Sequence, residues 1–234
     1  MDLNRGRGGR RSSTQLLRTD ALGWSQLSGL RLVVASFAIL SGETGVMAGS
    51  FEIGQGNAEI EGFVITTIDP DHALAGELTY FAVTVIPDMV LTGIAAIVVS
   101  TFVLTWAALF VQRKHGPLVL LGFFIAQTLV GGGWILGMAI ITVILATRIG
   151  KPLSWWRPRL TARARMVLDR LLLPSLVCYA IISAVLIAMT VLIVSHPSWW
   201  EPLNFLATVM FAPMILMILG ALAHDLRERP SADH

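Results

Sequence analysis

Apolar residues gather in long runs along the chain, and short polar segments separate them. Three of these runs, near 89–111, 171–194 and 205–222, approach the length that a membrane-spanning helix needs, about 20 residues at ~1.5 Å per residue. A fourth run covers 32–51 and is interrupted by Ser41-Gly42-Glu43-Thr44. This pattern predicts an all-α integral membrane protein.

The longest uncharged stretch covers 31 residues, from Pro117 to Thr147, and contains three consecutive glycines at 131–133. As one straight helix it would be about 46 Å long, against a hydrocarbon core of ~30 Å. It therefore forms either one strongly tilted span or two shorter arms that fold back at the glycines.

The basic residues favour the folded-back arrangement. All 17 Lys and Arg fall within 1–31, 113–114, 148–170 and 227–229, and the segments 52–88 and 195–204 contain none. The positive-inside rule places the four basic segments on the cytoplasmic side. Segments 113–114 and 148–170 must then share a side, so we predict a hairpin bent at Gly131–Gly133. A re-entrant loop is the alternative, whereas one tilted span would put seven positive charges outside.

The predicted architecture is a multi-pass bundle of about six helices in the cell membrane, with both termini cytoplasmic. A basic cytoplasmic N-terminus covers 1–31, a single membrane domain 32–224 and a cytoplasmic tail 225–234. The spans are expected at about 32–51, 88–112, 115–131, 133–150, 171–194 and 204–223, with an outer loop at 52–87 and a basic inner loop at 148–170. A cleavable signal peptide ending near Val46-Met47-Ala48 is the alternative for the first span.

The outer loop is a small acidic extracytoplasmic region with six acids and no Lys or Arg. Its run AEIEGFVITTI is rich in β-branched residues and follows a turn signal at Gly56-Asn57, which predicts a β-hairpin. Asp69-Pro70 is typical of a helix start. An apolar stripe follows it and predicts an amphipathic helix that ends or kinks at Pro87; the stripe comprises Leu74, Leu78, Phe81 and Val85.

Composition agrees with a membrane location and excludes several functional classes. The chain is 55% hydrophobic, 14% charged and has a mean hydropathy of +0.72, whereas soluble domains carry about 25% charged residues. One cysteine, Cys178, provides no disulfide framework and no metal-binding pair. The histidines show no metal-ligand spacing, and no cofactor motif or nucleic-acid signature is present.

Glu43 is the most informative single residue for function. It lies about 18 Å along the first helix from Arg31, in the outer half of the bilayer. A charged carboxylate there is costly, so it should be protonated, paired or in contact with water. The predicted spans contain no Lys or Arg to pair with it. Glu43 is therefore a candidate proton or cation site, or an anchor for a polar ligand.

Three further polar residues lie at a similar predicted depth. Asp88 follows Pro87 and is expected to be the N-cap of the second span, Gln127 lies one turn before the glycines, and Asn204 begins the last span. With Glu43 they form a candidate ligand- or ion-binding set beneath the glycine turn.

The basic inner loop suggests contact with lipid. Arginine clusters beside a membrane span bind anionic headgroups on the cytoplasmic side; the candidates are Arg157, Arg159, Arg163 and Arg165. Topology already accounts for these arginines, so they give no support for nucleic-acid binding.

Three functional classes follow. The first is a non-enzymatic accessory or scaffold component that binds other membrane subunits or a second copy of itself, motivated by GxxxG pairs at Gly45/Gly49 and Gly133/Gly137. The second is a small proton- or cation-linked transporter or channel that uses Glu43. The third is a membrane-embedded enzyme with an outward-facing site, although no catalytic motif is recognisable.

Overall fold

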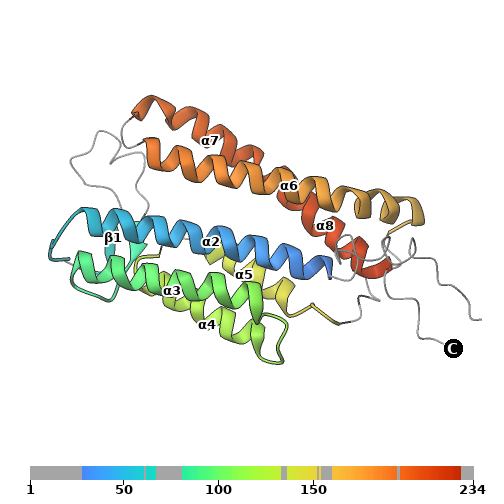
Figure 1. Ribbon diagram of the computed structural model, residues 1–234, viewed down its shortest axis with the longest axis horizontal. Helices are drawn as coiled ribbons and strands as arrows, with labels where there is room; N and C mark the ends of the chain where they lie inside the picture. The colour runs from blue at the N-terminus through green and yellow to red at the C-terminus, as the bar shows by residue number, and fades with distance from the viewer. Residues whose placement is uncertain are drawn as a thin grey trace, which may run out of the picture.

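The structure is a computed structural model that describes residues 28–60, 62–66, 81–132, 136–151, 153, 160–193 and 196–227. Its helices run along one long axis and form an elongated bundle (Figure 1). The elements are α2 (Gly29–Gly54), β1 (Val64–Thr66), β2 (Phe81–Val83), α3 (Met89–Leu109), α4 (Gly116–Leu129), α5 (Leu136–Ala146), α6 (Ala162–Ile193), the 3-10 helix η3 (Pro197–Trp199), α7 (Trp200–Val209) and α8 (Phe211–Arg227).

Four helical segments within the described residues are long and apolar enough to cross a membrane. They are α2, α3, α6 and the nearly continuous pair α7–α8, which spans Trp200–Leu226. Helices α4 and α5 are also apolar but shorter, at 14 and 11 residues. The fold is therefore that of an all-α protein embedded in a membrane.

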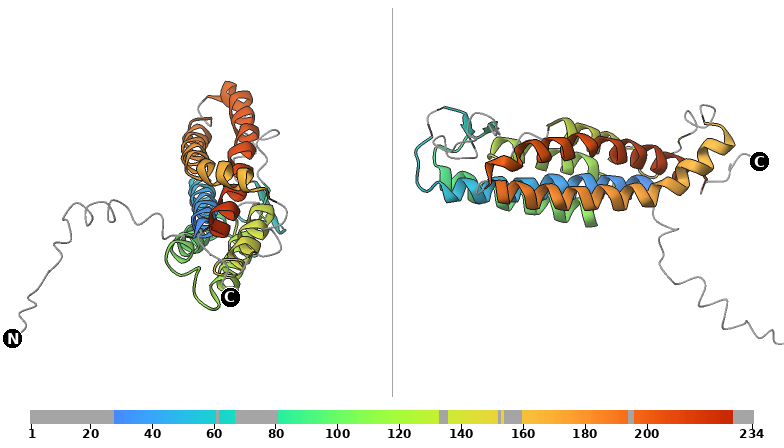
Figure 2. Two further views of the ribbon diagram at one scale, coloured as in Figure 1. Left: turned by 90° about the vertical axis from the view of Figure 1, so that its right-hand side faces the viewer. Right: turned by 90° about the horizontal axis from the view of Figure 1, so that it is seen from above.

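The bundle has two chemically different ends. At one end lie the start of α2, the loop between α3 and α4, the start of α6 and the end of α8 (Figures 1 and 2). Arg113, Lys114 and Lys151 are exposed at this end, which we call the basic end. The opposite end carries the paired strands β1 and β2, and we call it the β end.

The chain reverses direction between α4 and α5, as the glycines predicted. Helix α4 ends at Leu129, and Gly131 in the following turn has φ = +85°, a conformation that favours glycine. The start of α4 and the end of α5 meet at the basic end. There Lys114 and Pro117 line the same cavity, of about 330 Å³, as Thr147 and Lys151. Residues 113–114 and 148–151 therefore lie side by side.

The tip of this reversal reaches the β end. Trp106 Nε1 donates to the Gly116 carbonyl at 3.0 Å, which sets the start of α4 beside the last turn of α3. At the other end the Gly131 N–H donates to the Val83 carbonyl at 2.9 Å, and the Val85 N–H donates to the Leu129 carbonyl at 3.0 Å. The tip is thus hydrogen-bonded to the chain that leads into α3.

Part of the predicted outer region is different in the structure. Strand β1 pairs antiparallel with β2, with Ile65 opposite Ala82, rather than within its own run. The stripe predicted as an amphipathic helix included Phe81 and Val85, but Phe81–Val83 is a strand. From Ala82 to Val85 burial alternates with a period of two residues, which is typical of strands. The rest of the predicted helix, at 67–80, lies outside the described residues.

Three helices extend beyond the predicted spans or are divided within them. Helix α2 runs to Gly54, so Glu52 is helical rather than part of the outer loop. Helix α6 begins at Ala162, nine residues before the expected start and within the predicted inner loop. The last span begins at Trp200 and is interrupted at Met210, because Pro213 has no N–H to donate to the carbonyl four residues earlier.

Helix α2 packs against α3 through small residues. A Cβ at Gly49 would lie 2.5 Å from the Gly93 carbonyl oxygen, and a Cβ at Gly93 would lie 2.5 Å from the Gly49 carbonyl oxygen. A Cβ at Gly45 would collide with Ser100 Oγ and with Gln127 Nε2. The predicted close contact at Gly45 and Gly49 is therefore present, and it lies within the chain. Gly133 lies outside the described residues, and Gly137 has no neighbour within 4 Å of an added Cβ.

An acid from the last helix caps the first helix at the basic end. Asp225 is buried, and its carboxylate accepts from the Gly29 N–H at 2.6 Å, from Ser28 Oγ at 2.7 Å and from the Leu30 N–H at 3.5 Å. The first amides of a helix have no partner within the helix, and a carboxylate beside them also meets the positive end of the helix dipole. Asp225 therefore joins α8 to α2.

Replacing Asp225 by alanine is expected to lower the free energy of unfolding by about 1–3 kcal/mol, because charge-assisted hydrogen bonds to buried amides are lost. Reversible denaturation of the purified protein in detergent measures this. The control is Glu201→Ala, since Glu201 is exposed in the first turn of α7 and surface changes stay within about 0.5 kcal/mol. Equal losses in the two variants would contradict the capping role.

Candidate functional site

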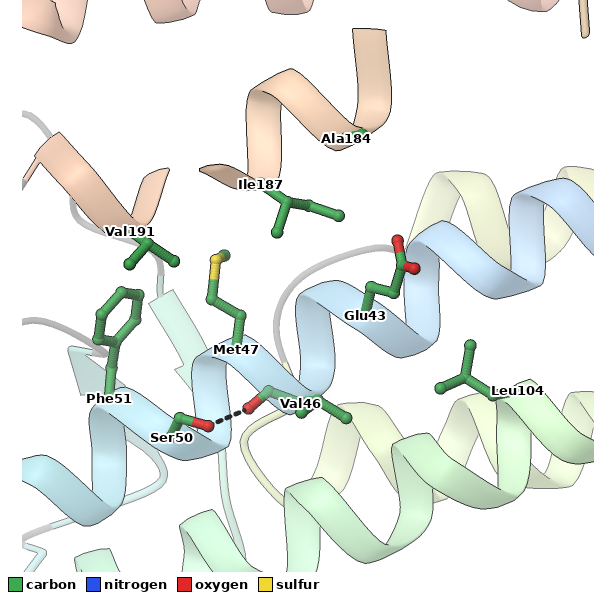
Figure 3. Close-up of a pocket in the computed structure, with 9 residues that line it drawn as sticks. All are labelled: Glu43, Val46, Met47, Ser50, Phe51, Leu104, Ala184, Ile187 and Val191. Atoms are coloured by element: carbon green, nitrogen blue, oxygen red, sulfur yellow. Dashed lines mark hydrogen bonds between the residues drawn. The ribbon is translucent and has the colours of Figure 1, made fainter. Parts of the chain in front are cut away.

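Glu43 lies near the middle of α2 and lines a groove between α2 and α6. It is 14 residues after Gly29 and 11 before Gly54, or about 21 Å and 16 Å along the helix. Its side chain is exposed and points into the groove, toward the side of α6 that carries Ala184 and Ile187 (Figure 3). The groove has a volume of about 610 Å³ and is lined by Glu43, Val46, Met47, Ser50, Phe51, Leu104, Ala184, Ile187 and Val191.

The lining of the groove is mostly apolar. Its two polar side chains are Glu43 and Ser50, and the Ser50 hydroxyl donates to the Val46 carbonyl at 2.8 Å. Tyr179 of α6 does not line the groove and is buried against Phe37 of α2, with ring centroids 5.5 Å apart. Glu43 is therefore the one ionisable group in an apolar lining.

Gln127 joins three helices instead of facing the groove. Its Nε2 donates to the Ser41 carbonyl at 2.8 Å and to Ser100 Oγ at 3.2 Å, and its Oε1 accepts from Ser41 Oγ at 3.3 Å. Its Nε2 also lies 3.5 Å from the Gly132 carbonyl oxygen. These contacts connect α4 to α2, α3 and the glycine turn. A buried amide with this many partners orders the core.

The four residues of the predicted set do not converge. Ser41, which binds Gln127, precedes Glu43 by two residues, and such positions point about 200° apart around a helix. Asp88 is the N-cap of α3, where its Oδ1 accepts from the Leu91 N–H at 2.8 Å; the predicted capping role is confirmed. Asn204 is exposed on α7. Of the four residues, Glu43 alone lines the groove.

The four arginines proposed for lipid contact are partly described. Arg163 is exposed and Arg165 half-buried in the first turn of α6, at the basic end. Arg157 and Arg159 lie outside the described residues. Within the described part of the chain, no group of three or more His, Cys, Asp or Glu side chains is arranged to hold a metal ion.

Sequence reasoning missed Glu52, which is the most completely buried acid in the described residues. Its side chain is 0% exposed, and neither carboxylate oxygen has a hydrogen-bond partner there. Ser41, Gly45, Gly49 and Glu52 are all buried on the face of α2 that packs against α3. The spacing of 4, 4 and 3 residues was visible in the sequence, because the GxxxG face continues directly to position 52.

No protein-family model matches the sequence, and no curated protein or solved structure shows significant similarity to it. Functional inference therefore rests on the geometry of the chain itself.

Replacing Gly131 by alanine is expected to destabilise the protein more than replacing Gly150, although both glycines have positive φ, +85° and +76°. A Cβ at Gly131 would lie 2.7 and 2.9 Å from the Glu52 carboxylate oxygens, whereas nothing lies within 4 Å of one at Gly150. Gly150→Ala should cost about 1 kcal/mol for its backbone conformation, and Gly131→Ala about 1–3 kcal/mol more for overpacking.

Unfolding in detergent measures both variants. Adding Glu52→Ala should recover part of the Gly131→Ala loss, because the smaller side chain makes room for the methyl group. The same loss for both glycine variants would show that the Gly131–Glu52 contact is absent.

Proposed function

We propose that the chain is a small proton- or cation-linked membrane transporter or channel, with Glu43 as the binding carboxylate. The observation that carries the proposal is an acid near the middle of an apolar helix that faces a groove of about 610 Å³. Acids within membrane spans generally face a cavity or the bundle interior and mark ion or substrate pathways. Lys and Arg are absent from 32–112 and 116–147, so the compensating positive charge comes from a bound cation or a proton.

The groove suits a monovalent cation of small or moderate size. Small-molecule sites are mostly apolar cavities of about 300–1,000 Å³ with a few placed polar groups. A lone carboxylate provides one negative charge, and the surrounding apolar side chains favour a proton or an organic cation with apolar groups. Either occupant removes the cost of a charged acid at this depth.

The contact of α2 with α3 makes the scaffold hypothesis less well motivated. The GxxxG pair at Gly45 and Gly49 was one of the features that motivated it, and both glycines are covered, Gly45 by Ser100 and Gln127 and Gly49 by α3. Because this face is used within the chain, it does not present a surface to a second subunit. An accessory role stays a prediction, and so does the enzyme hypothesis.

The proposal includes a membrane orientation. We place the basic end at the cytoplasmic face of the cell membrane, with both termini cytoplasmic and the β end outside. Arg113, Lys114 and Lys151 lie side by side, which supports this orientation. A single crossing between 117 and 147 would instead put Lys151 at the opposite end of the bundle. The tip of the α4–α5 hairpin is bonded to Val83 and Val85 next to the start of α3, which supports two crossings and about six in total.

Cysteine labelling of intact cells tests this orientation. In a Cys178→Ser background, single cysteines replace Phe63 near β1, Lys114 and Lys151, all of which are exposed. A membrane-impermeant maleimide should label Phe63→Cys directly, and Lys114→Cys and Lys151→Cys after permeabilisation only. Labelling of Lys114→Cys and Lys151→Cys from opposite sides would overturn the hairpin topology.

Flux measurements in proteoliposomes test the role of Glu43. Proton flux is followed with an entrapped pH-sensitive dye, and uptake of a radiolabelled quaternary ammonium ion is followed in parallel, so that the two arms distinguish the occupants. Glu43→Gln should abolish the flux that the wild type shows, because the negative charge is lost with the shape retained. Glu59→Gln is the matched control, since Glu59 is exposed outside the helices. Unchanged flux in Glu43→Gln would refute the proposal.

A further inference from the structure

Glu52 combines complete burial with a lack of hydrogen-bond partners. Its side chain is 0% exposed, and both carboxylate oxygens are unpartnered among the described residues. A Cβ built at Gly131 would lie 2.7 and 2.9 Å from the two Glu52 oxygens and 2.6 Å from the Thr92 methyl group, so the acid lies against the Gly131 backbone near Thr92. Buried polar atoms normally find a partner, so two orphaned oxygens on one acid call for an explanation.

The hydrogen-bond donors near Glu52 are committed to other acceptors. Thr92 Oγ1 donates to the Ile86 carbonyl at 3.2 Å and lies 3.1 Å from Thr84 Oγ1. The Gly131 N–H donates to the Val83 carbonyl at 2.9 Å, and the Gly132 N–H donates to the Gln127 carbonyl at 2.8 Å. These bonds turn the donors toward β2 and α4 rather than toward the acid. In this arrangement a negative charge on Glu52 would thus have no stabilising donor among the described residues.

The elements packed around Glu52 also lack a compensating cation. Helix α3, helix α4, the turn at 130–132 and strand β2 carry no Lys, Arg or His. The one acid at their boundaries is Asp88, whose carboxylate caps α3 through the Leu91 N–H. Glu43 lies on the opposite face of α2 from Glu52. The two residues are nine positions apart, which corresponds to about 900°, or two and a half helical turns, and to about 14 Å along the helix.

We propose that Glu52 is a proton-binding site at the β end of the bundle, closed by the Gly131 turn and the chain at Val83–Ile86. The neutral acid fits the enclosure, because it removes a charge that none of the described neighbours stabilises. The proton comes from water at the β end, converting the carboxylate to the carboxylic acid, and returns to water there when it leaves. This site is separate from the Glu43 groove and does not depend on transport.

Loss of this proton has a defined structural consequence. A charged Glu52 would attract the Gly131 N–H and the Thr92 hydroxyl, which now bind the Val83 and Ile86 carbonyls. The first bond holds Val83 against the glycine turn, and the second holds Ile86 against α3. Proton release is therefore coupled to the opening of this closure, and proton binding to its closing.

Infrared spectroscopy of the full chain in liposomes tests the site. The wild type at neutral pH should show the carbonyl stretch of a buried carboxylic acid, with a downshift in deuterated water. Glu52→Gln should lose this band, whereas Glu43→Gln and the exposed-acid control Glu59→Gln should keep it. A Glu52→Gln spectrum with the same carboxylic-acid bands as the wild type would overturn the proposal.

Hydrogen exchange provides a second readout, which is measured in the wild type and compared with Glu52→Gln. After correction for intrinsic rates, protection of the amides of Val85 and Gly131 in the wild type should fall at alkaline pH together with the loss of the infrared band. In a folded Glu52→Gln protein the protection should persist across the same range. Protection that is independent of pH in the wild type while the band disappears would contradict the coupling. Failure of Glu43→Gln to change flux leaves these outcomes unaffected.

Discussion

The close approach of α2 to α3 is the constraint on which the rest of the structure depends. Two apolar helices in lipid gain no hydrophobic energy by associating, so they rely on tight van der Waals packing and on polar contacts. Here the glycines at 45, 49 and 93 allow the backbones to meet, and Gln127 bonds to both helices at Ser41 and Ser100. This contact fixes the rotation of α2 about its axis. The rotation in turn places Glu52 inside the bundle and Glu43 in the groove.

The same contact divides the molecule into two parts. Helices α2 to α5 form a unit that is held by glycine packing, Gln127 and the bonds at the glycine turn. Helices α6 to α8 join this unit at the basic end, where Asp225 caps α2 and the adjacent His224 Nδ1 lies 2.8 Å from Asp169 Oδ1 of α6. Farther toward the β end the groove separates α2 from α6. The candidate site therefore lies where the two parts are least closely joined.

Much of the architecture could be predicted from the sequence, whereas the surroundings of the acids could not. The charge distribution predicted the reversal at Gly131, and residue chemistry predicted the Asp88 cap and the contact at Gly45. The depth of a residue along a helix, however, does not show in which direction its side chain points around the helix axis. Glu43 and Gln127 have a similar predicted depth, but Gln127 contacts the side of α2 opposite to Glu43. The first apolar run ends at Phe51, which places Glu52 at the start of the predicted outer loop, yet packing against α3 keeps α2 helical to Gly54. Phe81 and Val85 are four residues apart, a spacing that fits one face of a helix and also one face of a strand. Pairing with β1 makes Phe81–Val83 a strand.

The cap at the basic end also bears on the order in which the protein is assembled. The amides of Gly29 and Leu30 belong to the first described helix, but the carboxylate that satisfies them belongs to Asp225 in the last one. Synthesis proceeds from the N-terminus, so these amides have no carboxylate partner until the chain has been made as far as Asp225. A nascent chain that stalls or is truncated before α8 leaves the start of α2 uncapped. The start of α2 therefore gains its carboxylate cap only after α8 has been made and has packed beside it.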